Sequence, residues 1–292
     1  MLNIDKPGGM TSHDVVGRVR RIARQRRVGH AGTLDPDATG VLLICLGHAT
    51  RLADLLAEQG KTYRATLALG VTTSTEDSSG EILSETDASQ ITHPMLAEIL
   101  PRFLGDILQT PPMVSAVHHE GRRLYELARE GKIVERPPRS ITVDEITLES
   151  FTADVHSRAV LTVRCGKGTY VRTLCADLGK TLGVGGHMAS LIRLSVGSFD
   201  INHATPLDLL TEENIAGHLL SPSQALSFLP ARIVLPAEVS DLRNGKVLPL
   251  TTPLAFGALV RLIDDQDSLL ALGRVTAAGL IHPEKVFPPE QD

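Results

Sequence analysis

Helix-like and strand-like stretches follow one another irregularly along this 292-residue chain, and their order limits the possible fold more than any other feature. Residues 62–69 alternate polar and apolar side chains, as a half-buried strand does. Further strands are expected at 41–46, 141–148, 159–165 and 189–199, and helices at 12–23, 49–58, 94–104 and 171–182. Because there is no regular strand–helix–strand repeat, the sequence predicts an α+β fold on a mixed, mainly antiparallel sheet.

The pattern changes near Pro230. Residues 205–229 look helical and then proline-punctuated. Short strand-like runs follow at 232–235, 258–263, 269–275 and 280–287. We therefore expect a large domain over residues 1–229 and a small β-rich domain over residues 230–288.

The composition is that of a soluble globular protein, with 42% hydrophobic and 22% charged residues. The first residues show no basic segment followed by an apolar core, so no signal peptide is expected. The apolar run Val41–Leu46 is far shorter than the ~20 residues that span a bilayer. Cys45, Cys165 and Cys175 lack metal-ligand spacing, which is typical of buried thiols in a reducing cytoplasm.

Two basic runs point to a polyanionic partner despite the net charge of −5. One lies within residues 18–27, and the other lies in 109–140, a stretch that reads as a long loop with a short helix near 124–130. Such a loop in a compact domain is usually functional or mobile. The runs contain Arg18, Arg20, Arg21, Arg24, Arg26 and Arg27, and Arg122, Arg123, Arg129, Lys132, Arg136 and Arg139. Salt screens charges over ~8 Å, so local patches decide binding; a solvated helix face is the alternative interpretation.

The segment Gly29–Pro36 places one carboxylate, Asp35, on a glycine-rich loop. Glycines permit backbone angles that other residues avoid. Pro36 biases Asp35 away from the helical conformation. An acid held in this way is a candidate nucleophile, although on spacing alone an ordinary Asp-Pro turn is the alternative.

Several segments in order resemble the TruB-type tRNA pseudouridine-55 synthases over roughly residues 2–200. They are Asp5–Asp14 (DKPGGMTSHD), Val28–Pro36 (VGHAGTLDP), Lys61–Tyr63 (KTY), Thr75–Glu81 (TEDSSGE), Pro111–Ala116 (PPMVSA), Gly168–Arg172 (GTYVR) and Gly185–Leu191 (GGHMASL). The C-terminal part resembles the family's PUA-like RNA-binding domain more loosely. The resemblance implies a pseudouridine synthase fold in which 109–140 is an RNA-gripping insertion.

The resemblance implies that uridine is isomerised to pseudouridine. The glycosidic C1′–N1 bond breaks, the uracil turns, and a C1′–C5 bond forms. This reaction needs no cofactor, and the sequence shows no nucleotide-binding loop, metal cluster or redox pair. The family assigns the central role to Asp35, whose carboxylate attacks the sugar or the base, or takes a proton from the sugar; the sequence leaves these alternatives open.

The family also assigns roles to residues around the target uracil. Arg172 is the partner that keeps the buried Asp35 charged. Tyr63 stacks on the uracil and can act as a base late in the reaction, and Tyr170 lines the same pocket. The ordinary alternatives are a surface arginine and core packing for both tyrosines.

Three further residues match family positions that handle the RNA. His30 resembles the residue that fills the space left by the flipped uridine. Asp77 is expected to help hold a displaced base, with a plain turn residue as an equal alternative. Leu191 matches a position that contacts the uracil, and Lys6 with its neighbour Pro7 is expected to brace the active-site loop.

The sequence departs from the family pattern at four positions. The family usually has an aromatic residue at Val114, a lysine at His118, a serine at Gly166 and an arginine at Ile192. These changes leave the Asp35 chemistry intact and bear on RNA affinity and on the packing of the 109–140 loop.

The resemblance implies a monomer that acts on the T-arm loop of tRNA, without a membrane or a metal. Two rival hypotheses remain. One is an RNA chaperone that folds tRNA without chemistry. The other is a related synthase that acts on ribosomal or guide-directed RNA, which the compact C-terminus and the lack of a long basic tail disfavour.

Overall fold

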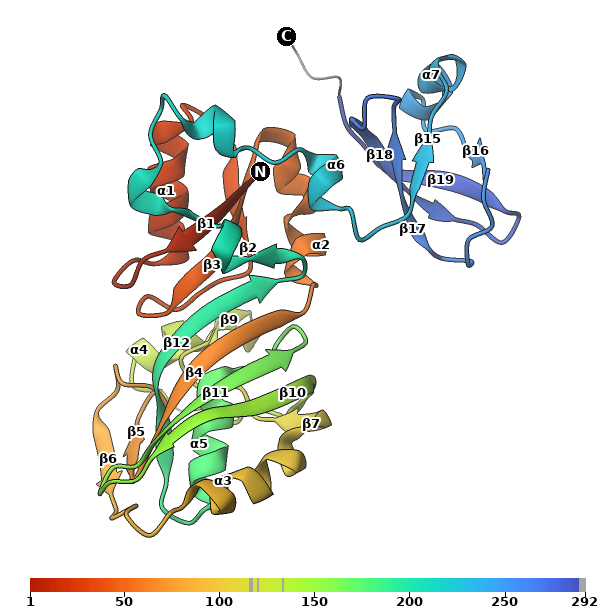
Figure 1. Ribbon diagram of the computed structural model, residues 1–292. Coiled ribbons are helices and arrows are strands. Elements are labelled where there is room, and N and C mark those ends of the chain that lie inside the picture. Colours follow the sequence, from red (N-terminus) through yellow and green to blue (C-terminus); the bar gives the residue numbers. More distant parts are fainter. Residues whose placement is uncertain (116–117, 120, 133, 289–292) are drawn as a thin grey trace.

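The computed structural model describes residues 1–115, 118–119, 121–132 and 134–288. Its centre is a ten-stranded sheet in the order β14-β1-β3-β12-β4-β11-β10-β7, with β2 beside β3 and β13 beside β12 (Figure 1). The strands are β1 Leu2–Lys6, β2 Val28–Ala31, β3 Thr39–Leu46, β4 Lys61–Leu69, β7 Gly105–Gln109, β10 Arg139–Thr152, β11 Arg158–Cys165, β12 Gly186–Val196, β13 Phe199–Asp200 and β14 Thr205–Pro206. Within this sheet the described pairings are antiparallel except β1 with β14 and β3 with β12, so the predicted mixed, mainly antiparallel sheet is confirmed.

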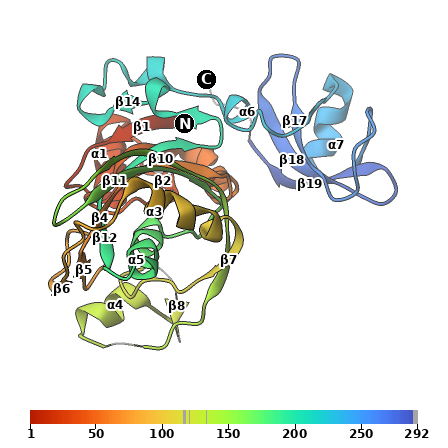
Figure 2. The ribbon, with the colours of Figure 1, turned by 60° about the horizontal axis from the view of Figure 1, so that its bottom comes forward.

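Helices cover this sheet. They are α1 Ser12–Ile22, α2 Ala53–Ala57, α3 His93–Ile99, α4 Leu124–Arg129 and α5 Val171–Thr181, with 3-10 turns η1 Gly47–Leu52 and η2 Leu100–Phe103. A capping box between Thr11 and Asp14 starts α1 where the sequence predicts it. α5 packs against β12 and β4, and Figure 2 shows α3 beside it. Two small hairpins, β5 Val71–Thr73 with β6 Ile82–Glu85 and β8 His118–His119 with β9 Arg122–Arg123, extend from the sheet.

A second sheet forms the C-terminal part, in the order β15-β17-β18-β19-β16. Its strands are β15 Ala231–Ile233, β16 Leu248–Pro249, β17 Leu259–Ile263, β18 Leu269–Val275 and β19 Leu280–Val286, with η6 Pro236–Glu238 and α7 Val239–Arg243 between them. Leu272 and Phe287 join an apolar cluster that also contains Leu52 and Leu56. The two sheets therefore share buried contacts.

The prediction of helix over 205–229 is wrong. The structure has only short elements there: β14, then η4 Leu207–Leu209, η5 Ile215–His218 and α6 Pro222–Ala225, after η3 Ile201–His203. Pro206 and Pro222 lack the backbone N–H that a helix interior needs, and Gly217 adds flexibility. Apolar residues such as Leu207 and Leu210 bury their side chains against the main core without a continuous helix.

Other differences are smaller. The predicted helices at 49–58 and 94–104 are each split into a 3-10 turn and a short α-helix. Strands β1, β2 and β7 are additions to the elements expected, and His30 lies in β2 rather than on the loop that follows. Ala116 of the PPMVSA segment lies outside the described residues. Within the described part of the chain, every helix is too short or too polar to cross a membrane.

Two registers of the sheet place the functional residues. In β12, Arg193 pairs with Tyr63 of β4 on one side and with Gly40 of β3 on the other. The loop between β2 and β3 carries Asp35, and α5 begins with Arg172 one residue inside. The strands therefore bring residues that are 130 positions apart in the sequence to one place near the middle of the sheet.

Candidate active site

Hydrogen bonds fix the loop that carries Asp35 at the residues directly before and after it. Ser12 Oγ accepts from the backbone N–H of Leu34 at 2.8 Å and donates to the Leu34 carbonyl at 3.1 Å. The Pro36 carbonyl accepts from the backbone N–H of Gly9 at 3.0 Å. The start of α1 and the turn that follows β1 therefore hold the residues on either side of Asp35.

Lys6 is one of two buried cations that hold this loop. Its side chain is fully buried, and Nζ donates to the carbonyl oxygens of Pro7 at 2.8 Å, Met10 at 2.6 Å and Pro36 at 2.9 Å. All three protons of the ammonium group are used. Lys6 thus connects β1 to the part of the loop that follows Asp35. It braces the loop there, as expected from the sequence.

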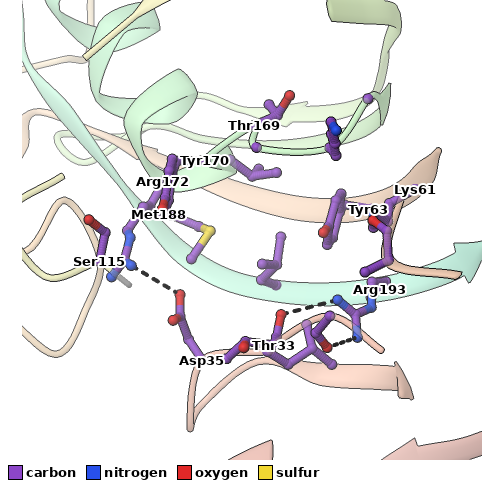
Figure 3. Close-up of a pocket in the computed structure, with 18 of the residues that line it drawn as sticks. Thr33, Asp35, Lys61, Tyr63, Ser115, Thr169, Tyr170, Arg172, Met188 and Arg193 are labelled. Atoms are coloured by element: carbon purple, nitrogen blue, oxygen red, sulfur yellow. Dashed lines mark hydrogen bonds and ion pairs between the residues drawn. The ribbon is translucent and has the colours of Figure 1, made fainter. Parts of the chain in front are cut away.

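Arg193 holds the part of the same loop that precedes Asp35. It is 1% exposed, and its Nε donates to the Val41 carbonyl at 2.7 Å. Its Nη1 and Nη2 each lie 3.2 Å from the carbonyls of Thr33 and Gly32 (Figure 3). No carboxylate among the described residues forms an ion pair with Arg193 or with Lys6. Backbone carbonyls are the hydrogen-bond acceptors of Lys6, and the charges of Asp37 and Asp35 act on it from a greater distance.

Sequence reasoning missed Arg193, although a signal was present. It stands inside a stretch predicted as a strand, next to Ile192, where the family usually has arginine. An arginine between apolar residues of a central strand has no route to solvent. It must therefore find hydrogen-bond acceptors inside the protein.

Arg172 is shared by two carboxylates. Its Nη1 lies 3.0 Å from Asp77 Oδ2 and its Nη2 lies 3.5 Å from Asp35 Oδ2. Nη2 also donates to the Val114 carbonyl at 2.7 Å. The Arg172 side chain is 6% exposed, that of Asp77 14% and that of Asp35 42%. The guanidinium is therefore fixed on the buried side by Asp77 and presents its other edge to Asp35.

The two carboxylates have opposite pKa shifts. Desolvation raises the pKa of Asp35 above its ordinary value, against the opposing effect of the Arg172 charge. Desolvation also acts on Asp77, but hydrogen bonds from Ser79 and Thr75 and the charge of Arg172 outweigh it and lower the pKa of Asp77. Asp77 is thus the better stabilised anion, whereas Asp35 is the less stabilised and more reactive of the two.

A cavity of about 700 Å³ lies over Asp35. In Figure 3, Asp35, Arg172, Ser115 and Met188 lie toward one side of it, and Tyr63, Lys61 and Arg193 toward the other. Its lining consists of Gly32, Thr33, Leu34, Asp35, Pro36, Ala57, Lys61, Tyr63, Val114, Ser115, Gly166, Lys167, Gly168, Thr169, Tyr170, Val171, Arg172, Met188, Leu191 and Arg193. Asp35, Tyr63, Tyr170, Arg172 and Leu191, named from the sequence, meet here, whereas Asp77 and His30 are not part of the described lining.

The two tyrosines take up different positions. Tyr63 lies on the central strand β4, and burial raises the pKa of its hydroxyl. Tyr170 caps the start of α5, and its ring centroid lies 5.9 Å from the Arg172 guanidinium carbon. Gln109 fixes the Tyr170 backbone, accepting from its N–H at 2.8 Å and donating to its carbonyl at 3.0 Å. Gln109 is a further residue that the sequence did not single out.

His30 is partly buried in β2, and Asp77 lies in the turn after β5. Burial lowers the pKa of His30, as does the charge of Arg193, so its imidazole is neutral near pH 7. Asp77 holds Arg172, and its expected part in holding a displaced base stays a prediction. Of the departures from the family pattern, Val114 contributes its carbonyl to Arg172, and Gly166 lies in the cavity wall. The side chain of His118 lies outside the described residues.

The arrangement suits attack by a carboxylate on a planar, polar ligand. An aspartate kept ionised by a buried arginine faces a cavity whose other wall carries a tyrosine ring, able to stack on a flat heterocycle. The described residues include no group of three or more His, Cys, Asp or Glu side chains placed to hold a metal ion.

Comparisons with known families and proteins cover nearly the whole chain. Residues 20–171 match the family described as TruB family pseudouridylate synthase (N terminal domain). Residues 172–242 match the tRNA pseudouridylate synthase B C-terminal domain.

Curated relatives are similar over their full length. A tRNA pseudouridine synthase B of Synechococcus sp. is 43% identical over 98% of this chain and 97% of its own. The protein of the same description from Acaryochloris marina is 42% identical over 99% of both chains.

Solved structures share the fold. A chain of an H/ACA RNP bound to a substrate RNA containing 2′-deoxyuridine is 25% identical, with a TM-score of 0.75 over 99% of this chain and 85% of that one. A chain of a Cbf5-Nop10-Gar1 complex is 26% identical with the same TM-score, over 99% of this chain and 84% of that chain.

Proposed function

The chain belongs to the TruB family of pseudouridylate synthases, and we propose that it isomerises the T-loop uridine of tRNA, at position 55, to pseudouridine. The observation that carries this proposal is the pairing of Asp35 with Arg172 at 3.5 Å in the wall of a cavity of about 700 Å³, which has room for a flipped nucleoside. The full-length similarity to proteins described as tRNA pseudouridine synthase B supports tRNA as the substrate.

Asp35 supplies the reactive carboxylate. Its oxygen attacks the sugar or the base, or removes a proton from the sugar, while the C1′–N1 bond breaks. The freed uracil turns and C5 bonds to C1′; C5 then loses its proton to a base, and N1 ends the reaction protonated. Arg172 keeps the carboxylate charged, and Asp77 keeps Arg172 in place. The clamps by Lys6 and Arg193 fix the backbone around Asp35, so the attacking atom needs little reorganisation.

The other cavity residues bind the base. Tyr63 stacks on the uracil and is the candidate base for the C5 proton late in the reaction. Burial raises the pKa of its hydroxyl, which is therefore neutral while the uracil binds. Tyr170 and Leu191 complete the walls. His30 fills the space that the flipped uridine leaves in the RNA; its neutral imidazole suits stacking between bases.

The remaining surfaces bind the rest of the tRNA. We assign residues 1–229 to a catalytic domain with 109–140 as an RNA-gripping insertion, and residues 230–288 to a PUA-like RNA-binding domain. In the first basic run, Arg18 and Arg24 pair with Asp208 and Glu212. The exposed Arg21, Arg26 and Arg27 form no described ion pair, which leaves them available to phosphates. We propose that the protein acts as a cytoplasmic monomer.

A tritium-release assay tests the reaction. Tritium at uracil C5 of a tRNA transcript is lost when C5 bonds to the sugar. We expect release by the wild-type protein at the T-loop uridine, and none by Asp35→Asn, which keeps its affinity for tRNA. Asp37→Asn is the matched control because it removes an exposed carboxylate two residues away. Release at another uridine would show that the protein modifies a different position from the one proposed. Tight tRNA binding without release would favour an RNA chaperone.

A further inference from the structure

A nucleotide that swings into the cavity remains joined to its RNA chain by two phosphates, which stay near the mouth. The affinity of RNA-binding proteins comes largely from cations that contact such phosphates. The burial of the cations that line the cavity indicates which of them can contact such a phosphate. The inference rests on the proposed function, because it takes RNA as the ligand.

Lys61, Lys167, Arg172 and Arg193 are the described cations in the cavity lining. Three of them are buried, with exposed fractions for the whole residue of 7% for Lys61, 5% for Arg172 and 1% for Arg193. Arg172 and Arg193 bind the partners given above. Lys61 Nζ donates to the carbonyls of Ala57 at 2.5 Å and Gln59 at 2.7 Å. These three stabilise the protein's own backbone and carboxylates.

Lys167 differs from these three. Its side chain is 63% exposed, and it stands between Gly166 and Gly168 in the connection from β11 to α5. A Cβ atom at Gly168, whose φ is +82°, would meet nothing within 4 Å, so the wall is open to solvent at this point. The same connection carries Tyr170 and leads to Arg172, which places Lys167 on the rim of the cavity.

The Lys167 ammonium is already paired in the free protein. It forms an ion pair with Glu58, the residue that ends α2, whose side chain is 53% exposed. Ala57, next to Glu58, also lines the cavity. The pair therefore joins two lining segments across the rim. Ion pairs this exposed contribute little to stability. A phosphate of the RNA backbone, which belongs to a polyanion, can therefore displace Glu58.

We propose that Lys167 binds a backbone phosphate beside the flipped nucleotide and that Glu58 holds this lysine at the rim until RNA arrives. The carboxylate serves two purposes here. It keeps the lysine oriented toward the mouth, and it competes with RNA for the ammonium. Binding at this position is then an exchange of one anionic partner for another.

The test measures the tRNA concentration that gives half-maximal single-turnover tritium release, at several KCl concentrations. For Lys167→Ala we expect a higher half-maximal tRNA concentration. The log–log slope of apparent tRNA affinity against KCl concentration should become shallower by about 0.7–0.9, which is the share of one phosphate contact. The half-maximal concentration should change more than the maximal rate, because Lys167 forms no described contact with Asp35 or Arg172. Lys180→Ala is the matched control: it removes an exposed lysine about 15 Å along α5, by the helical rise.

Glu58→Gln tests the competition. It should lower the half-maximal tRNA concentration by about two- to five-fold, as expected when one exposed ion pair no longer competes with the RNA. This gain should vanish in Glu58→Gln combined with Lys167→Ala. An equal gain in both backgrounds, or an unchanged salt slope in Lys167→Ala, would overturn the proposal, as would an equal slope change in Lys180→Ala. If the wild-type protein released no tritium, the proposed function would fail, and filter binding of the same variants to tRNA would still judge the phosphate contact.

Discussion

Asp77 holds Arg172 more closely than the catalytic candidate does: its Oδ2 lies 3.0 Å from the guanidinium, on the buried side. Asp77 is itself fixed by the Ser79 backbone N–H at 3.0 Å and the Thr75 hydroxyl at 2.6 Å. The position of Arg172, and through it the charge on Asp35, therefore depends on a turn far from Asp35 in the sequence.

Asp77→Asn should slow the reaction without weakening tRNA binding. The amide keeps part of the hydrogen bonding but removes the charge that fixes Arg172, so the guanidinium shifts relative to Asp35. A displacement of about 1 Å can cost on the order of 10²-fold in rate. Single-turnover tritium release and filter binding measure the two quantities. A rate within two-fold of wild type would show that Arg172 needs no such support.

The reaction rate should fall at acid pH with an apparent pKa above the ordinary aspartate value of about 3.9. Desolvation raises the pKa of Asp35, and only the ionised carboxylate reacts, so activity is lost as the pH falls through that raised value. Single-turnover release from pH 4 upward, with far-UV circular dichroism to confirm folding, measures the profile. A rate that stayed flat to the acid limit of folding would contradict it.

Asp35→Asn should stabilise the fold at neutral pH. A carboxyl group whose pKa is higher folded than unfolded costs stability once ionised, and this cost develops as the pH rises through the interval between the two values. Removing the charge removes that cost. Urea unfolding at pH 7 should give Asp35→Asn a higher midpoint than Asp37→Asn, and the difference should shrink toward pH 4. A lower midpoint for Asp35→Asn would mean that its pairing with Arg172 outweighs desolvation.

Gly40→Ala should destabilise the protein severely. Gly40 has a φ of +98°, and a Cβ there would lie 2.3 Å from the Arg193 carbonyl oxygen, a backbone atom that cannot move aside. Gly9→Ala is the control, because Gly9 has a similar φ of +77° but open space around its Cβ. We expect about 1–2 kcal/mol for Gly9→Ala and a clearly larger loss of unfolding free energy for Gly40→Ala, measured in urea. Equal losses would show that the backbone conformation alone matters.

The regular patterns in the sequence predicted most of the fold. Strand β4, helix α1 with its cap and helix α5 follow local signals of alternation, capping and helical spacing. Residues 205–229 defeated the same reasoning, because their leucines are buried by tertiary packing and not by a helix. Strands β1 and β2 went unnoticed because β1 runs into one segment that reads as a motif and β2 lies inside another.

The cavity residues were accessible from motifs, whereas their supports were not. Asp35, Tyr63 and Arg172 stand in recognisable segments. Arg193 and Gln109 act through backbone atoms, and such contacts depend on which strands pair, as in the register of Arg193 with Gly40. A single sequence gives no direct sign of that register. The position of Asp77 against Arg172 likewise follows from packing between a turn and a helix.

The clamps by Lys6 and Arg193 bear on how this loop can be engineered. Both cations grip main-chain oxygens, at Pro36 and at Gly32 and Thr33, and such bonds do not depend on the side chain at the gripped position. The exposed Thr33 can therefore be varied in a directed-evolution library while the loop keeps its shape. If the loop were grafted onto another scaffold, in contrast, it would lose its geometry unless Lys6 and Arg193 were grafted with it.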